Sequence, residues 1–182
     1  MEFRPVEKKD KGARRVVLRT LEVKDEGTLI RFQAQASLDS EFFPWAPGRT
    51  DLAADNARDY IERFAGAERE MLLGVFEDGE LVALTELASL GTWPFFQHRC
   101  SAALGILKSH WGRGLGSILT STVSEIARSV GYDQIEGSID VLNERSYSRC
   151  LSIGYEDCGY LPHAEKREDG TYRDYHRMVK KM

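Results

Sequence analysis

The stretch HWGRGLGSIL, residues 110–119, places three glycines at alternate positions directly before a strongly helical run. Each glycine costs about 0.5–1 kcal/mol relative to alanine inside a helix. The start of a helix leaves backbone N–H groups unpaired, and the helix dipole puts about half a positive charge there. Bare backbone at that point lets an anion approach closely, so the stretch predicts a phosphate-binding site. Arg113 adds a charge that can pair with a phosphate.

Three glycine signatures compete for this stretch. The dinucleotide fingerprint GxGxxG fails, because Leu119 stands where its last glycine is required after Gly114 and Gly116. The P-loop GxxxxGK[ST] also fails, because this region has no Gly-Lys pair. What remains is GRGLG between a predicted strand and a long amphipathic helix, or a turn that the glycines merely shape.

Periodicity and turn signals divide the rest of the chain into alternating strands and helices. Strands are predicted for RVVLRTL from Arg15, for both sides of a hairpin at Asp78-Gly79, and for CSAALGIL, QIEGSIDV, YEDCGYL and YRDYHRMVKKM. Helices are predicted over 24–37, 50–65, 115–130 and NERSYSRCLSI. We therefore expect a flexible arm over residues 1–12 and a single α/β domain over residues 13–182.

Composition limits the class of protein. The 182 residues are 42% hydrophobic and 30% charged, which is typical of one globular domain. The net charge of -4 argues against nucleic acid as a partner. Cys100, Cys150 and Cys158 show no CxxC spacing, so we expect no metal site, no disulfide framework and a cytoplasmic location. No apolar leader and no run of about 18 apolar residues occurs, so we expect no membrane partner.

The glycine stretch resembles the acyl-CoA-binding motif of the GNAT superfamily of N-acetyltransferases, (Gln/Arg)-x-x-Gly-x-(Gly/Ala). The motif maps onto Trp111, Gly112, Arg113, Gly114, Leu115 and Gly116. Trp111 departs from the usual Gln or Arg, which removes one phosphate contact but no backbone donor. A tryptophan before the glycine is similar to the ribosomal-protein-acetylating (RimJ/RimL-like) branch.

The resemblance covers roughly residues 15–182 in order. VLNERSYSRCLSIGYEDCG is similar to the family's second signature, with Asn143 near a helix start and Gly154-Tyr155 after its end. VVLRTLEVKDEGTL is similar to the first strand and helix, and DGTYRDYHRMV to the last hairpin. The resemblance implies a mixed, mostly antiparallel sheet of six to seven strands, flanked by about four helices and splayed at the acyl-CoA site.

The resemblance also implies acetyl-CoA as co-substrate. Its pyrophosphate would meet residues 111–116 and Ser117, and its pantetheine arm would lie between two splayed strands. The open backbone from Leu104 to Ile106 would bond the pantetheine amides, and a backbone N–H there would polarise the thioester carbonyl. Asn143 would help to hold the arm.

Transfer to an amine gains from a base, because only about one lysine-type amine in 10³ is neutral at pH 7. Glu86 in VALTELAS is the base candidate, since it shares strand parity with Val82 and Leu84 on an apolar face. The alternative is a solvated glutamate at a sheet edge. His98 is favoured as an ordinary surface histidine, and His110 as a packing or capping residue.

The leaving thiolate could take a proton from an acid on the second helix. The family often has a tyrosine there, and that position falls on Cys150 in this chain. Tyr147, one turn earlier, is the other candidate. The alternative for Cys150 is a small packing residue. An acyl-cysteine is not expected, because the sequence places no histidine beside it.

The acceptor should be an amine, and the acidic balance mildly favours a cationic one. Phe43 and Trp45 in FFPWAP, with Trp93 and Phe95 in GTWPFF, could wall its cleft or lie at the core edge. A protein N-terminus, an amino acid, a polyamine and an antibiotic all stay open, and a homodimer is compatible with the family. The rival functions are a non-catalytic acyl-CoA sensor, a nucleotide-binding oxidoreductase and a plain interaction module.

Overall fold

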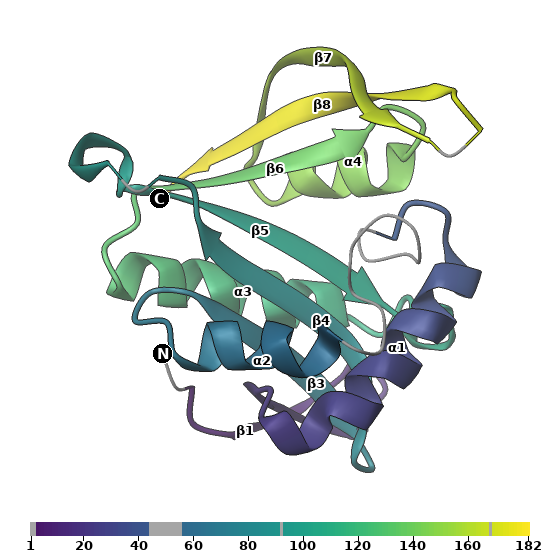
Figure 1. Ribbon diagram of the computed structural model, residues 1–182. Helices are drawn as coiled ribbons and strands as arrows, with labels where there is room; N and C mark the ends of the chain where they lie inside the picture. Colours follow the sequence, from purple (N-terminus) through teal and green to yellow (C-terminus); the bar gives the residue numbers. More distant parts are fainter. Residues whose placement is uncertain (1–2, 44–55, 92, 168) are drawn as a thin grey trace.

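Figure 1 shows a computed structural model, which describes residues 3–43, 56–91, 93–167 and 169–182. The strands form one mixed sheet in the order β1-β2-β3-β4-β5-β6-β8-β7. Neighbouring strands are antiparallel except β5 and β6, which are parallel. The strands are β1 (Val6–Lys9), β2 (Arg15–Thr20), β3 (Met71–Glu77), β4 (Glu80–Ser89), β5 (Arg99–Ile106), β6 (Gln134–Asp140), β7 (Glu156–Lys166) and β8 (Tyr172–Lys181). The α/β class and the mostly antiparallel sheet are confirmed.

Helices cover both faces of this sheet (Figure 1). They are α1 (Glu26–Asp39), α2 (Ala57–Ala65), α3 (Leu115–Ser129) and α4 (Glu144–Ser152), with short 3-10 turns at Val23–Asp25, Pro94–Phe96 and Lys108–His110. α1 and α2 bury Phe32 and Ile61 against Leu84 on one face. α3 buries Leu119 and Val123 on the opposite face. The sheet is therefore covered by buried apolar side chains on both sides where β2 to β4 lie.

Local sequence signals predict most of these elements well. Asp78 and Gly79 have φ of 50° and 86°, as a two-residue hairpin turn requires, and they join β3 to β4. The helix expected over 24–37 begins two residues later, because a 3-10 turn precedes α1. The helix expected over 50–65 is seen as α2, and residues 50–55 lie outside the described part of the chain.

Two features of the fold differ from expectation. β1 pairs with β2, with Val6 opposite Leu18, so the supposed arm contributes an edge strand and the sheet has eight strands rather than six or seven. The second feature is a bulge between Val75 and Phe76, which shifts the pairing of β3 with β4. Alternation in β4 therefore changes near Val82, so Val82 does not share a face with Leu84 and Glu86.

β5 and β6 pair only at their beginning. Their ladder runs from Arg99 opposite Gln134 to Ser101 opposite Glu136. Beyond it β5 continues to Ile106 and β6 to Asp140, and the two strands diverge (Figure 1). The expected splay of the sheet is confirmed.

Candidate functional site

A cleft of about 970 Å³ lies where β5 and β6 separate. β5 contributes Ala102 to Leu104 to its lining and β6 contributes Gly137 to Asp140. α3 and α4 line it with Thr120, Val123, Ser146 and Arg149 among others. The cleft is thus one continuous opening. It extends from α3, the helix that follows the glycine stretch, to the C-terminal end of β6 and the adjacent start of β8.

The glycine loop leads directly into α3. Gly112 and Gly114 have φ of 77° and 84°, a left-handed conformation that other residues rarely adopt, and Gly114 is the N-cap of α3. Ser117 donates from its backbone N–H to the Gly114 carbonyl at 3.0 Å. The backbone N–H groups before Ser117 come ahead of this first intrahelical bond, so the helix itself offers them no acceptor. Leu115 adds only backbone here, because its side chain is buried in the core. The loop therefore needs glycine for its shape, and it presents the backbone donors that an anion site requires.

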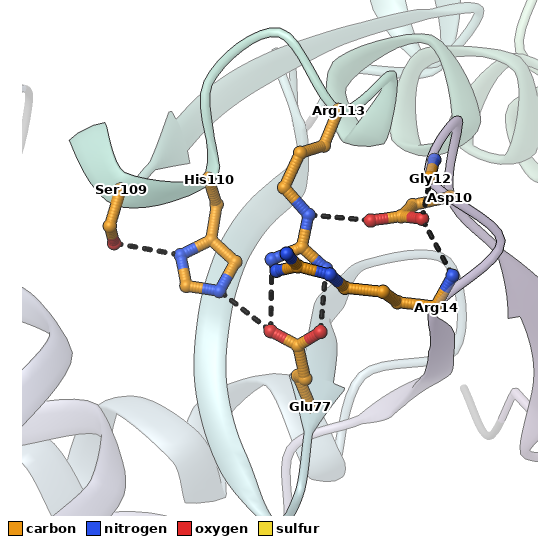
Figure 2. A network of polar contacts seen from close by, with 7 residues as sticks. All are labelled: Asp10, Gly12, Arg14, Glu77, Ser109, His110 and Arg113. Carbon is orange, nitrogen blue, oxygen red and sulfur yellow. Dashed lines mark hydrogen bonds and ion pairs between the residues drawn. The ribbon is translucent and has the colours of Figure 1, made fainter.

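The Arg113 side chain has a role other than the expected phosphate contact. Its guanidinium donates to both carboxylate oxygens of Glu77, at 2.9 and 2.6 Å, and to Asp10 at 2.5 Å (Figure 2). Asp10 in turn accepts from the backbone N–H groups of Gly12 and Arg14. The side chain is 13% exposed. Two carboxylates thus neutralise Arg113, and it connects the loop to the residue after β1 and to the end of β3 instead of projecting toward a ligand.

His110 belongs to the same network. Its Nε2 lies 2.8 Å from Glu77 and its Nδ1 lies 2.8 Å from the Ser109 hydroxyl (Figure 2). The Arg113 guanidinium lowers the pKa of Glu77 from 4.5 to about 2; burial opposes this effect and the hydrogen bond with His110 adds to it. His110 packs beside the helix start as expected. His98 uses its carbonyl to accept from Asp133 and Gln134, and its side chain is exposed.

The backbone of β5 is open toward the cleft. Leu107 donates to Val82 of β4 at 3.1 Å, and paired residues alternate in direction along an antiparallel ladder. The N–H and C=O groups of Leu104 and Ile106 therefore point away from β4. Trp111 donates from its indole to the Ile106 carbonyl at 2.8 Å. Leu104 keeps both groups directed at the gap, whereas the Ile106 carbonyl already has a partner.

One face of α4 forms the opposite wall of the cleft. Asn143 caps the helix by accepting from the Ser146 N–H at 3.1 Å, and the same face continues through Arg149, Cys150 and Ile153. The sequence analysis missed Arg149 as a site residue. Six residues of helix turn a side chain by about 240°, so the spacing from Asn143 does not mark Arg149 as a cleft residue, and its place depends on how α4 packs on α3.

The two acid candidates on α4 are separated by the structure. Cys150 lines the cleft, and burial raises the pKa of its thiol, with the Arg149 charge opposing. Tyr147 lies outside the cleft lining and donates to Asp157 of β7 at 3.0 Å, which raises the pKa of Tyr147. Three residues of helix turn a side chain by about 60°, and from Cys150 to Tyr147 this turn leads away from Ser146 and Arg149, which line the cleft. Of the two acid candidates, Cys150 is the one that lines the cleft.

Glu86 lies in the middle of the sheet. It stands between Leu72 of β3 and Ala103 of β5, so the alternative of a sheet-edge position is wrong. Its side chain is half-buried on the face covered by α1 and α2, and the Tyr60 hydroxyl donates to it. Glu86 itself is not among the cleft-lining residues, but its neighbour Ala103 is. Cross-strand neighbours have Cβ atoms about 4.5–5.5 Å apart, so one water could join the carboxylate to the cleft.

The expected aromatic wall does not form from the described residues. Phe43 is 4% exposed and packs edge-on against Phe32 in the core, because it follows the end of α1. Trp93 and Phe95 are 70% and 85% exposed and do not line the cleft. Trp45 lies outside the described residues. Phe42, one residue before Phe43, is the aromatic side chain that reaches the cleft from this segment.

Charged side chains gather at the outer end of the cleft. Arg173 is 6% exposed and donates to Asp140 at 2.6 Å and to Glu41 at 2.9 Å. The described lining holds five acidic and five basic side chains, namely Glu41, Glu136, Asp140, Glu165, Asp169, Arg149, Lys166, Arg167, Arg173 and Arg177. The acidic balance of the whole chain is thus not repeated in the cleft, and it does not decide the charge of an acceptor.

Two further features concern only the part of the chain that the structure describes. No group of three or more His, Cys, Asp or Glu side chains there is arranged to hold a metal ion. Within the same residues, every helix is too short or too polar to cross a bilayer.

Comparison with known proteins gives the family. The structure is similar to an acetyltransferase of the GNAT family from Streptococcus pneumoniae, with a TM-score of 0.82 and 20% identity over 92% of this chain and 99% of that chain. It is also similar to a ribosomal-protein-alanine N-acetyltransferase from Brucella melitensis, with a TM-score of 0.78 and 20% identity over 91% and 99% of the chains. A third similar structure, from Salmonella typhimurium, was solved with its cofactor acetyl-CoA (TM-score 0.76, 18% identity, 91% and 93% covered).

At these identities the solved structures show the fold. No curated protein matches the chain in sequence. The family model described as the acetyltransferase (GNAT) domain matches residues 15–156. Since that match spans most of the sequence, the chain belongs to the GNAT acetyltransferase family.

Proposed function

We propose that this protein transfers an acetyl group from acetyl-CoA directly to a primary amine. The observation that carries the proposal is the divergence of β5 and β6, which leaves an opening lined in part by α3, the helix that the glycine loop begins. That opening, about 970 Å³ in volume, is large enough for a ligand arm and is lined by open backbone on one side. Acetyl-CoA supplies an acetyl group already activated as a thioester.

The residues present fit this ligand. Gly112, Gly114 and Gly116 leave the backbone at the start of α3 free of side chains, so the N–H groups there are suited to the pyrophosphate. The N–H and C=O of Leu104 are suited to the pantetheine amides, which would continue the sheet as a short strand. Asn143 stands across the cleft, where its amide would help to hold that arm.

The acceptor must lose a proton before or during attack. A lysine-type amine with a pKa of about 10.4 is neutral in only about one molecule in 10³ at pH 7, whereas an α-amine near 8 is neutral in about one in ten. We assign Glu86 as the base, acting through a water at Ala103, because the Tyr60 hydrogen bond fixes its carboxylate in a half-buried place. The expected acceptors are a protein N-terminus, an amino acid, a polyamine or another small amine.

Cys150 is the group suited to protonate the leaving thiolate. It lines the cleft, and its raised pKa keeps it a thiol at neutral pH. Among the described residues no histidine lines the cleft, and His176 pairs with Asp157 outside it, so Cys150 has no imidazole base beside it that would make it a nucleophile. Direct transfer, with both substrates bound together, is therefore the expected order.

The first experiment measures thermal unfolding with acetyl-CoA, with NAD as the control. A ligand at 100 times its Kd adds about 2.7 kcal/mol, which raises the midpoint by roughly 5–11 °C for a domain of this size. A shift with acetyl-CoA alone supports the cofactor, and no shift at millimolar concentration refutes the proposal.

A panel of amines then tests the reaction. Intersecting initial-velocity patterns are expected, and parallel patterns or an acetylated Cys150 would contradict direct transfer. Glu86→Gln should lower kcat at neutral pH by about 10²-fold or more, with less effect as the pH rises. Acetyl-CoA binding without turnover of any amine would favour the non-catalytic sensor.

A further inference from the structure

We propose that Arg149 and Lys11, rather than the loop arginine Arg113, supply the positive charge that holds the phosphates at the glycine loop. This inference rests on the proposed function, because it takes acetyl-CoA as the ligand. It assigns the cofactor contact to side chains from α4 and from the segment after β1, neither of which belongs to the glycine motif.

Arg149 lies flat against the third glycine of the loop. A Cβ atom built on Gly116 would meet its Nη2 at 3.0 Å, its Cζ at 3.1 Å and its Nε at 3.3 Å. Among the described residues its guanidinium makes one polar contact, a weak one of 3.5 Å from Nη2 to the Ser117 hydroxyl. Within the described part of the chain no carboxylate pairs with Arg149, although the side chain is half-buried and lines the cleft. A guanidinium in such a place retains most of its donors for a ligand.

Lys11 lies against the second glycine. A Cβ atom on Gly114 would meet the Lys11 side chain at 3.0 Å from Cγ, 3.5 Å from Cδ and 3.4 Å from Cε. The Lys11 backbone N–H donates to the Arg113 carbonyl at 3.0 Å, so the whole residue is held at the loop. Its ammonium forms no ion pair with any residue that the structure describes.

Electrostatics indicates what this arrangement is for. Lys11 and Arg149 lie at the positive end of the α3 dipole, where cations are disfavoured unless an anion lies between them. Glu77 and Asp10 neutralise Arg113 but not these two. An anionic ligand with closely spaced phosphates would relieve the repulsion and could be bonded from both sides of the loop.

The experiment is calorimetric titration of the full chain with two probes. Acetyl-CoA carries the phosphates, and acetyl-pantetheine carries the same thioester arm without them. Arg149→Gln should weaken acetyl-CoA about tenfold or more, and Lys11→Met by a smaller factor, because each removes a charge-assisted hydrogen bond. Acetyl-pantetheine should bind both variants and the wild type equally. Added salt should weaken acetyl-CoA less in the variants than in the wild type.

Lys9→Met is the matched control, because Lys9 is an exposed lysine of β1 that pairs with Arg15 of β2. It should bind acetyl-CoA like the wild type. Unliganded Arg149→Gln should unfold at the wild-type temperature or slightly above it, since a repulsive charge has been removed. Wild-type affinity for acetyl-CoA in both variants, or an equal loss for acetyl-pantetheine, would overturn the inference. A wild-type protein that binds no acetyl-CoA would instead overturn the proposed function itself.

Discussion

The two halves of the molecule are stabilised by different interactions. The first half contains β1 to β5 with α1, α2 and α3, and the second contains β6 to β8 with α4. α3 buries six of its residues, Leu115, Gly116, Leu119, Val123, Ser124 and Ala127, whereas α4 buries none. β3 is buried along nearly its whole length, and β7 is exposed along most of its length. The first half therefore has a true apolar core, and the second half is a layer attached to it.

Polar contacts join the second half together. Arg173 forms ion pairs with Asp140, at the end of β6, and with Glu41. The Asp157 carboxylate is shared by Tyr147 and His176. Such contacts contribute less net stability than apolar burial, because each side chain gives up water to make them. The comparison indicates that the core half holds the glycine loop rigidly, while the polar half forms the more adaptable wall of the cleft.

The largest change in stability is expected from a cavity in the half with the apolar core. Leu119→Ala should lower the free energy of unfolding by about 2–5 kcal/mol, because Leu119 is fully buried between α3 and the sheet. Leu151→Ala on α4 is the control and should change it by about 0.5 kcal/mol or less, since Leu151 is 44% exposed. Urea unfolding measures both. Equal losses would mean that α4 also stabilises the fold through packing.

A second prediction concerns the ion-pair network that fastens the loop to the core half. Glu77→Gln should lower the free energy of unfolding at pH 7 by about 1–3 kcal/mol, because Arg113 loses a charged partner.

The pH dependence of the same variant sharpens this prediction. The folded pKa of Glu77 is lowered to about 2 from 4.5, so its contribution is complete above pH 4.5 and is lost as the pH falls toward 2. Unfolding midpoints measured across that range should converge for wild type and variant. A constant difference down to pH 2 would show that Glu77 acts through packing alone.

A third prediction separates the conformational strain at a glycine with positive φ from the role of the glycine loop in binding acetyl-CoA. Gly114→Ala and Gly170→Ala should each cost about 1 kcal/mol of stability, because φ is 84° and 82° at these positions. Only Gly114→Ala should also weaken acetyl-CoA, since Gly170 lies in the turn between β7 and β8. Calorimetric titration of both variants tests this, and an equal loss of affinity would remove the special role of the loop.

The smallest effect is expected at Tyr147, on the polar half. Tyr147→Phe should lower the unfolding midpoint by no more than about 2 °C, because its hydroxyl contact with Asp157 is exposed. Its kcat for acetylation should match the wild type, whereas Cys150→Ala should lower kcat. A large loss of kcat in Tyr147→Phe would restore this residue as the acid.

Elements whose signals are local could be predicted from the amino-acid sequence alone. The turn at Asp78-Gly79, the long amphipathic helix α3 and the left-handed glycines before it all depend on neighbours within about four residues. The order of these elements indicated an α/β domain, and the resemblance to the GNAT family implied the splay of its sheet. The glycine loop is therefore found in the right place without any coordinates.

The partners that side chains find across the fold depend on its tertiary contacts. Arg113 meets Asp10 across 103 residues and Glu77 across 36 residues, and no local pattern marks either carboxylate as its partner. β1 was overlooked for the same reason, because a short polar edge strand is recognisable only through its neighbour β2. The placement of Arg149 against Gly116 likewise depends on how α4 packs on α3. Ion pairs and edge strands are set by contacts between distant segments, and those contacts exist only once the chain has folded.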